Sequence, residues 1–127
     1  MMEILFRGKR IDNGEWSEGA FLNDRGGSFY ICPAVIDISY GDSGNRRRIG
    51  SWYKVDHSTV GQYTGMKDKN GNRIFEGDIL SIWNESHDVV VFEDGAFDLE
   101  NTSIPIRFAN KFEVIGNITD NPELLEK

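Results

Sequence analysis

The sequence lacks several features on which common protein classes depend. Among its 127 residues there is one cysteine, Cys32, so an internal disulfide is excluded. The only two histidines, His57 and His87, lie thirty positions apart and beside no second nitrogen or sulfur ligand, so a transition-metal site is not expected. No apolar run is long enough for a signal peptide or a transmembrane segment. The sequence therefore predicts a cytoplasmic protein without a membrane partner.

Basic residues are also in short supply. The formal net charge is −7, with 14 Lys and Arg residues against 21 Asp and Glu residues. This balance opposes an attraction of the whole protein to nucleic acid or to an anionic membrane, although a local basic patch can still differ from the average.

Proline is rare and glycine is abundant, with three and 14 residues respectively, and aromatic residues make up 12% of the chain. Short strands joined by glycine turns are typical of this composition. We expect an all-β fold of short-stranded small barrels, with a final helical turn at Glu123–Lys127 that Asn121 caps. The length suits one domain, residues 1–127, or two β subdomains, residues 1–60 and 61–127.

Turn signals divide the first half of the chain. The turn Asp12-Asn13-Gly14 separates a strand at Ile4–Arg10 from a strand at Glu15–Leu22. Gly41–Gly50 is predicted as a flexible basic loop, because its small polar residues have little to bury. Asp56–Val60 is predicted as a turn or a single helical turn, at a soft boundary between the subdomains.

The second half of the chain begins with the most strongly patterned stretch, Gly61–Ile82. Asn70-Gly71 tolerates positive φ and predicts a tight hairpin turn between strands at Gln62–Met66 and Arg73–Phe75. Further on, a loop is expected at Ser86–Asp88.

A short phrase within this half, Phe75–Leu80, resembles the opening of SH3-like barrels. It leads into strands at Ile79–Ile82 and Val89–Glu93 and a two-residue hairpin at Asp94-Gly95. The SH3 analogy concerns the fold and says nothing about activity.

A set of short stretches along the chain carries a family resemblance. They are Phe6–Lys9, Asp12–Trp16, Val55–Val60, Tyr63–Gly71, Ile74–Ile79, Val114–Ile118 and Asn121–Leu125. In these stretches the chain resembles the YopX family of bacteriophage and prophage proteins. The resemblance covers nearly the whole chain and departs most between Phe21 and Arg48. It implies a small, mostly β, phage-encoded protein with no established activity.

One cluster of oxygen-bearing side chains suggests a metal site. Its members are Asp68, Asn70, Asn72, Glu76 and Asp78. Counted from Asp68 as the first position of an EF-hand loop, however, Arg73 stands where glycine is needed and Ile79 where the bidentate glutamate belongs. We therefore interpret the cluster as turn chemistry, with Asp78 bonding nearby backbone amides, and predict no metal and no cofactor.

The sequence also predicts no catalytic group of residues. A Cys–His nucleophilic pair would need Cys32 to meet His57 or His87 in space, and Cys32 lies in an apolar strand where a buried, inert thiol is the usual outcome. Close pairs of acidic residues are expected by chance in so acidic a chain. These pairs are Glu76/Asp78, Glu93/Asp94 and Asp98/Glu100. We predict that the protein is not an enzyme, with an unrecognised hydrolase as an alternative.

The run Arg46-Arg47-Arg48 offers the one basic and aromatic combination that the sequence reveals. With Tyr40 on one side and Trp52-Tyr53 on the other, it has the residue types that grip phosphate and stack a base. A solvated loop explains the run more simply, because a specific grip needs more cationic contacts.

The leading hypothesis is an accessory protein that acts by binding a protein partner or by self-assembly into a homo-oligomer, without catalysis. The conspicuous rings are expected to fill the core, namely Trp16, Trp52, Trp83, Phe97 and Phe112. Exposed strand edges, or a tryptophan left at the surface, would provide the contact surface. A nucleic-acid-binding module that uses Arg46, Arg47 and Arg48 is the alternative. The sequence does not identify the partner.

Overall fold

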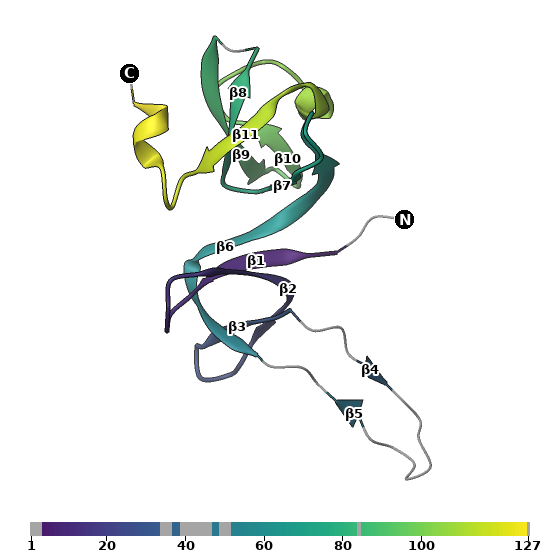
Figure 1. Ribbon diagram of the computed structural model, residues 1–127, viewed down its shortest axis with the longest axis vertical. Coiled ribbons are helices and arrows are strands. Elements are labelled where there is room, and N and C mark those ends of the chain that lie inside the picture. The colour runs from purple at the N-terminus through teal and green to yellow at the C-terminus, as the bar shows by residue number, and fades with distance from the viewer. Residues whose placement is uncertain (1–3, 34–36, 39–46, 49–51, 84, 127) are drawn as a thin grey trace. The chain divides into compact units, whose positions relative to one another are not determined.

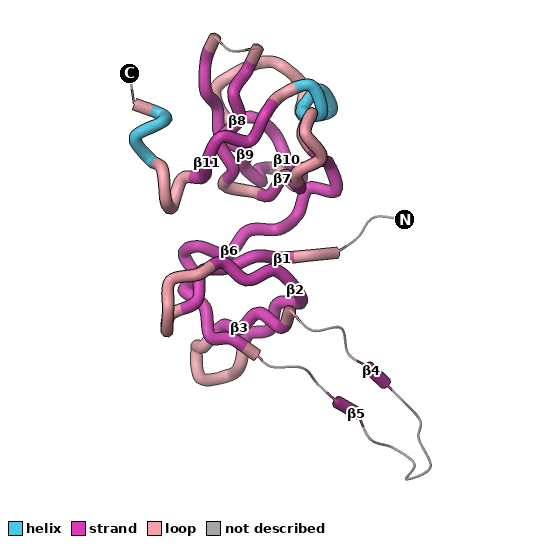
Figure 2. The backbone as a smooth tube through the Cα atoms, viewed as in Figure 1, coloured by secondary structure: helices cyan, strands magenta, loops and turns pink. Residues whose placement is uncertain are grey.

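The computed structural model describes residues 4–33, 37–38, 47–48, 52–83 and 85–126 (Figure 1). Strands account for most of this part of the chain, and the two helical elements are short 3-10 turns (Figure 2). The expected all-β fold is confirmed. In chain order the elements are β1 (Phe6–Arg10), β2 (Trp16–Asn23), β3 (Phe29–Cys32), β4 (Asp37–Ile38), β5 (Arg47–Arg48), β6 (Tyr53–Lys67), β7 (Arg73–Phe75), β8 (Asp78–Ile82), β9 (Ser86–Glu93), β10 (Ala96–Leu99), η1 (Ile106–Lys111), β11 (Glu113–Asn117) and η2 (Pro122–Leu125).

The chain forms two compact units. Leu5–Val60 makes up the N-terminal unit, and Gly61–Lys127 together with Met1–Ile4 makes up the C-terminal unit. Strand β6 contributes residues to both units. Whether either unit folds by itself stays a prediction.

In the N-terminal unit, β1, β2, β3 and the first part of β6 form an antiparallel sheet that closes on itself, because β6 pairs with β1 as well as with β3. Closure leaves no open edge among these four strands. The small core contains Ile31, Cys32 and Val55, each at most 2% exposed. The predicted first hairpin is confirmed as β1 and β2.

Two glycines let the strands of this unit approach closely. A Cβ atom at Gly8 would lie 3.0 Å from the Val55 side chain, and one at Gly19 would overlap the carbonyl oxygen of Cys32. At Gly19 only glycine fits, because the backbone of Cys32 comes so near.

The C-terminal unit contains a four-stranded antiparallel sheet in the order β10-β9-β8-β11, with 3-10 turn η1 between β10 and β11 in sequence. That order is compatible with the SH3-like barrel predicted for this half, which stays a prediction. Its core consists of buried apolar residues from β7, β8, β9, β10 and η1, and from the position just before β11. They are Ile74, Leu80, Ile82, Val90, Leu99, Ala109 and Phe112.

The two predicted glycine turns of this unit differ. Asp94 and Gly95 have φ values of 53° and 82°, so the two-residue hairpin between β9 and β10 is confirmed. Around Asn70-Gly71 the predicted tight turn with positive φ at both residues is not formed, because of the two only Gly71 has a positive φ (85°), and Asp68–Asn72 connect the strands. The flanking strands β6 and β7 are where the pattern predicts them.

Two predicted turns are strands, so those predictions are wrong. Asp56–Val60 belongs to β6, where the Thr59 hydroxyl accepts a hydrogen bond from the Lys9 amide of β1 at 2.8 Å. Ser86–Asp88 opens β9 and pairs with β8, with Ser86 opposite Ile82. In both places polar residues form a strand because neighbouring strands provide the hydrogen bonds.

The predicted basic loop is only partly described. Arg47–Arg48 forms β5 and pairs with Asp37–Ile38 of β4, whereas the rest of Gly41–Gly50 lies outside the described residues.

Near the C-terminus, η2 confirms the expected helical turn. Its cap differs, because the Asn121 side chain makes no bond to η2 and instead accepts one from the Asn117 amide at 3.3 Å.

Within the described part of the chain no helix is long and apolar enough to cross a membrane.

Candidate functional site

In the cluster that suggests a metal site, the Asp68 carboxylate accepts hydrogen bonds from backbone amides. The Asp68 carboxylate, only 4% exposed, accepts hydrogen bonds from the amides of Asn70 (2.9 Å), Asn72 (2.8 Å) and Val114 (2.9 Å). Burial alone raises the pKa of this carboxyl group, but these amide bonds together hold the pKa of Asp68 below its ordinary value. Asp68 therefore fastens the β6–β7 turn to β11.

Two further buried aspartates have the same kind of role. Asp78, 1% exposed, accepts from the Phe75 amide at 2.7 Å, as the sequence predicts. Asp88, 2% exposed, accepts from the backbone and side-chain amides of Asn101, with both oxygens engaged. Across the described ranges, no group of three or more His, Cys, Asp or Glu residues is arranged to hold a metal ion.

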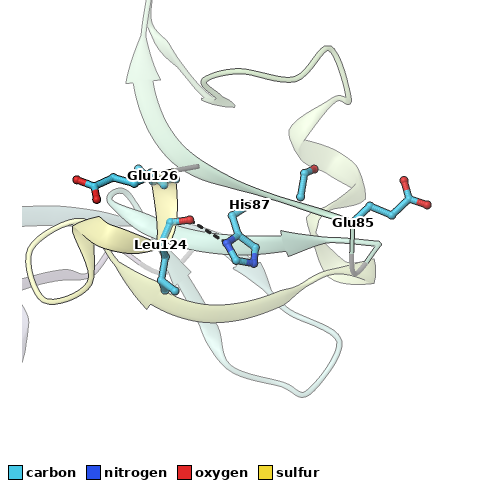
Figure 3. A pocket seen from close by; sticks show the side chains of 6 residues that line it. Glu85, His87, Leu124 and Glu126 are labelled. Atoms are coloured by element: carbon cyan, nitrogen blue, oxygen red, sulfur yellow. Dashed lines mark hydrogen bonds between the residues drawn. The ribbon is translucent and has the colours of Figure 1, made fainter.

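His87 is the most promising group for chemistry. Its Nδ1 atom lies 2.8 Å from the carbonyl oxygen of Leu124, and because a carbonyl can only accept, Nδ1 carries the hydrogen (Figure 3). In the neutral ring Nε2 is then an acceptor. The ring borders a pocket of ≈ 240 Å³ between the start of β9 and η2.

The surroundings of His87 do not complete a catalytic group. Figure 3 shows the carboxylates of Glu85 and Glu126 directed away from the ring. A second pocket, of ≈ 400 Å³, shares Ser86 and His87, but its acid, Asp88, is already bound to Asn101. The site can accept a proton at Nε2, and the described residues provide no hydrogen-bonded nucleophile beside it.

The other two candidates for nucleophilic chemistry belong to the N-terminal unit, whereas His87 belongs to the C-terminal unit. Cys32 is buried at 2% exposure in the core of the N-terminal unit. His57 lies in the same unit, with its ring stacked on Phe29 at a centroid distance of 4.0 Å and an interplanar angle of 11°. That stack continues through Phe21 to Phe6 across four strands. His57 therefore extends a row of packed rings.

Trp83 is a conspicuous exposed side chain in the C-terminal unit, so the prediction that it fills the core is wrong. It is 57% exposed and packs edge-on against Phe112 at a centroid distance of 5.1 Å. Its φ of 48° is rare for a bulky residue and costs about 1–2 kcal/mol. Among the described residues only Asp94, in a hairpin turn, shares a positive φ without being glycine. A costly conformation thus holds an indole at the surface.

A second feature, in the N-terminal unit, combines cations with rings around β1. The Arg7 guanidinium lies 4.8 Å and the Lys9 ammonium 5.9 Å from the ring centroid of Trp16, and the Arg10 guanidinium lies 3.8 Å from that of Tyr53. Because side chains alternate along a strand, Arg7, Lys9 and Trp16 lie on one side of the sheet, and Arg10 and Tyr53 lie on the other, the side of Gly8 and Val55.

The sequence-based view that Arg46–Arg48 is the one basic and aromatic combination is therefore wrong. The three cations within Phe6–Arg10 are visible in the sequence, but the rings come from two other strands. Arg46 lies outside the described residues, and for Arg47 and Arg48 only the strand pairing is described. Nucleic-acid binding by these three arginines stays a prediction.

The architecture defines a small all-β protein of two units, and comparison with known proteins gives its family. The family model described as YopX protein matches residues 6–126, so the chain belongs to the YopX family. A similar solved structure is the crystal structure of protein EF1440 from Enterococcus faecalis. It is 30% identical, with a TM-score of 0.74 over 99% of this chain and 100% of that one. No curated protein matches.

Proposed function

We propose that this protein is a phage-encoded accessory protein that binds a partner protein through Trp83 in the cytoplasm of the bacterial host. The resemblance to phage and prophage proteins supports its origin. The observation that carries the binding role is the exposure of Trp83 in a conformation that costs stability. Tryptophan is also among the residues most enriched at the centres of protein interfaces.

Charge favours a different protein over a second copy as the partner. Gly61–Lys127 contains thirteen acidic and six basic residues, whereas Leu5–Val60 contains seven acidic and eight basic residues. Two acidic units brought together through Trp83 would repel each other, while a cationic partner would be attracted. The partner we propose has a positively charged surface around an apolar pocket.

Binding accounts for the described side chains better than hydrolysis does. His57 is packed in a row of rings, and the His87 Nδ1 atom is engaged by Leu124. The buried carboxylates of Asp68, Asp78 and Asp88 accept hydrogen bonds from amides. Each candidate for acid–base chemistry thus has a structural role that explains it.

The test compares wild-type protein with Trp83→Asn as bait in lysates of infected host cells, followed by calorimetry with the purified partner. Asparagine tolerates positive φ, so relief of backbone strain offsets the lost contact with Phe112. We expect stability within about 1 kcal/mol of wild type. Binding should weaken by about 30-fold or more, which corresponds to a hot spot of about 2 kcal/mol.

Phe92→Asn is the matched control, because Phe92 is also an exposed aromatic residue of the same unit, at 48% exposure. It should retain the partner. Equal capture by wild type and Trp83→Asn would disprove the proposed role of Trp83. A wild-type homo-oligomer that Trp83→Asn converts to a monomer in light scattering would show self-assembly instead of a hetero-partner.

A further inference from the structure

The four-stranded sheet of the C-terminal unit has two edge strands, and they differ in what lies beside them. Strand β11 is tied to the β6–β7 turn, because its Val114 amide donates to the Asp68 carboxylate at 2.9 Å. Strand β10 pairs with β9 alone among the strands that the structure describes. The other side of β10 is therefore an unpaired sheet edge.

The hydrogen-bond register shows which backbone groups face this edge. The Glu100 amide donates to the Val89 carbonyl of β9 at 3.1 Å. Alternate residues of an antiparallel strand direct their backbone groups to opposite sides, so Asp98 also faces β9, whereas Phe97 and Leu99 face outward. The Leu99 amide is accordingly bound by the Asp98 carboxylate, at 2.9 Å. An acid thus occupies a donor that a further strand would use.

The two faces of the β9–β10 hairpin carry different side chains beside the edge. On the core face Leu99 is buried, and the half-buried Phe97 contacts Phe92 of β9 at a centroid distance of 5.0 Å. On the opposite face the register places the exposed acids Asp98 and Glu93. The edge is therefore apolar on one face and acidic on the other.

We infer that the outer edge of β10 binds an extended segment of a partner protein in which basic and apolar residues alternate. In an antiparallel addition, the partner residues opposite Phe97 and Leu99 exchange backbone hydrogen bonds with them and lie on the apolar face. The partner residue between them stands opposite Asp98, on the acidic face. A partner carbonyl replaces the Asp98 carboxylate on the Leu99 amide, and the released carboxylate pairs with the basic side chain.

A second copy of this chain fits the edge less well. A two-fold pairing that joins Phe97 of one copy to Leu99 of the other would set the two Asp98 side chains directly opposite each other, where like charges are destabilising. The C-terminal unit, with fourteen acidic and six basic residues, would add to the repulsion and would attract a basic segment. The inference does not depend on the binding role proposed for Trp83.

The experiment measures the fluorescence anisotropy of a short labelled peptide in which lysine and valine alternate, with the full-length protein. Wild type should bind this peptide and should not bind one in which glutamate replaces lysine. N-methylation of the valine amides removes the hydrogens that point to β10, so it should abolish binding. N-methylation of the lysine amides, which point away from β10, is the matched control and should be tolerated.

Asp98→Asn tests the acidic face, because it keeps a carbonyl oxygen for the Leu99 amide and loses the charge. It should weaken binding about two- to fivefold, the scale of an exposed ion pair, and reduce the salt dependence. Glu123→Gln removes an exposed charge from η2 of the same unit and should leave binding unchanged. Both variants should unfold at the wild-type denaturant midpoint.

The inference is overturned if wild type does not bind the lysine–valine peptide, if the two N-methylated peptides behave alike, or if Asp98→Asn and Glu123→Gln have the same effect. It is also overturned if Trp83→Asn abolishes peptide binding while Asp98→Asn does not, because the segment then binds at Trp83. A wild-type dimer that the peptide dissociates, seen by light scattering, would show that a second copy occupies the edge instead.

Discussion

The Asp68 side chain resembles a metal ligand in the sequence, but in the structure it holds a turn in place by accepting hydrogen bonds. Its carboxylate collects amides from its own turn and from Val114, 46 residues further on. The sequence predicted turn chemistry here because the EF-hand spacing fails. It could not reveal the bond to Val114, since that partner approaches only when β11 closes the sheet.

Asp68→Asn should lower the free energy of unfolding by about 1–3 kcal/mol, because a buried acceptor of several amides becomes partly a donor. The folded-state pKa lies below the ordinary value of 3.8. Stability from the carboxylate is therefore fully present above about pH 4 and is lost as the pH falls through the folded-state pKa. Denaturant titrations at several pH values would measure both effects.

The same substitution at Asp94, which is exposed in the β9–β10 hairpin, is the control. Asparagine also tolerates positive φ, so Asp94→Asn should change stability by less than about 0.5 kcal/mol. If Asp68→Asn kept the wild-type acid sensitivity, the Asp68 carboxylate would not be the group that titrates.

Among the elements, the closed sheet of the N-terminal unit depends most on a single position. Gly19→Ala places a methyl group onto the Cys32 carbonyl, so β2 and β3 must move apart. We expect a loss of more than about 2 kcal/mol, the scale of an overpacked core. Chemical denaturation followed by circular dichroism would measure the loss.

Gly26→Ala in the adjacent β2–β3 turn is the matched variant. The added Cβ there would have only an ordinary contact, 3.5 Å from an Asp24 carboxylate oxygen. Its stability should remain close to that of wild type. A similar loss for both variants would contradict the role of the approach to Cys32, because the chain entropy that Ala removes from the unfolded state is by itself stabilising.

Most strands could be predicted because turn residues mark their ends, as at Asp12–Gly14 and Asp94-Gly95. The errors at Asp56–Val60 and Ser86–Asp88 share a cause. Polar sequences look like turns locally, and only pairing with β1 or β8 makes them strands. The cation–ring contacts of β1 were missed for a similar reason, because strand pairing brings Trp16 beside Arg7 and Lys9, and Tyr53 beside Arg10.

At the scale of the whole molecule, charge is divided unequally between the units. Raising the salt concentration from about 10 mM to about 150 mM shortens the screening length from about 30 Å to about 8 Å. This should stabilise the C-terminal unit, which has fourteen acidic and six basic residues, more than the nearly balanced N-terminal unit. Amide hydrogen exchange should therefore slow more in β8 and β9 than in β2 and β3.

Potassium chloride in place of sodium chloride is a control for ion identity and should give the same result. Equal slowing in both units would contradict the expected difference, because it would indicate a general effect of salt on burial.

The buried position of Cys32 has a practical consequence. As the only thiol in the chain, and one that lies in the core of the N-terminal unit, it reacts with an alkylating reagent only when that unit opens. The rate at which Cys32 is alkylated therefore reports how often the N-terminal unit opens. The measurement needs no mutation or dye, and mass spectrometry can follow it while a partner is bound.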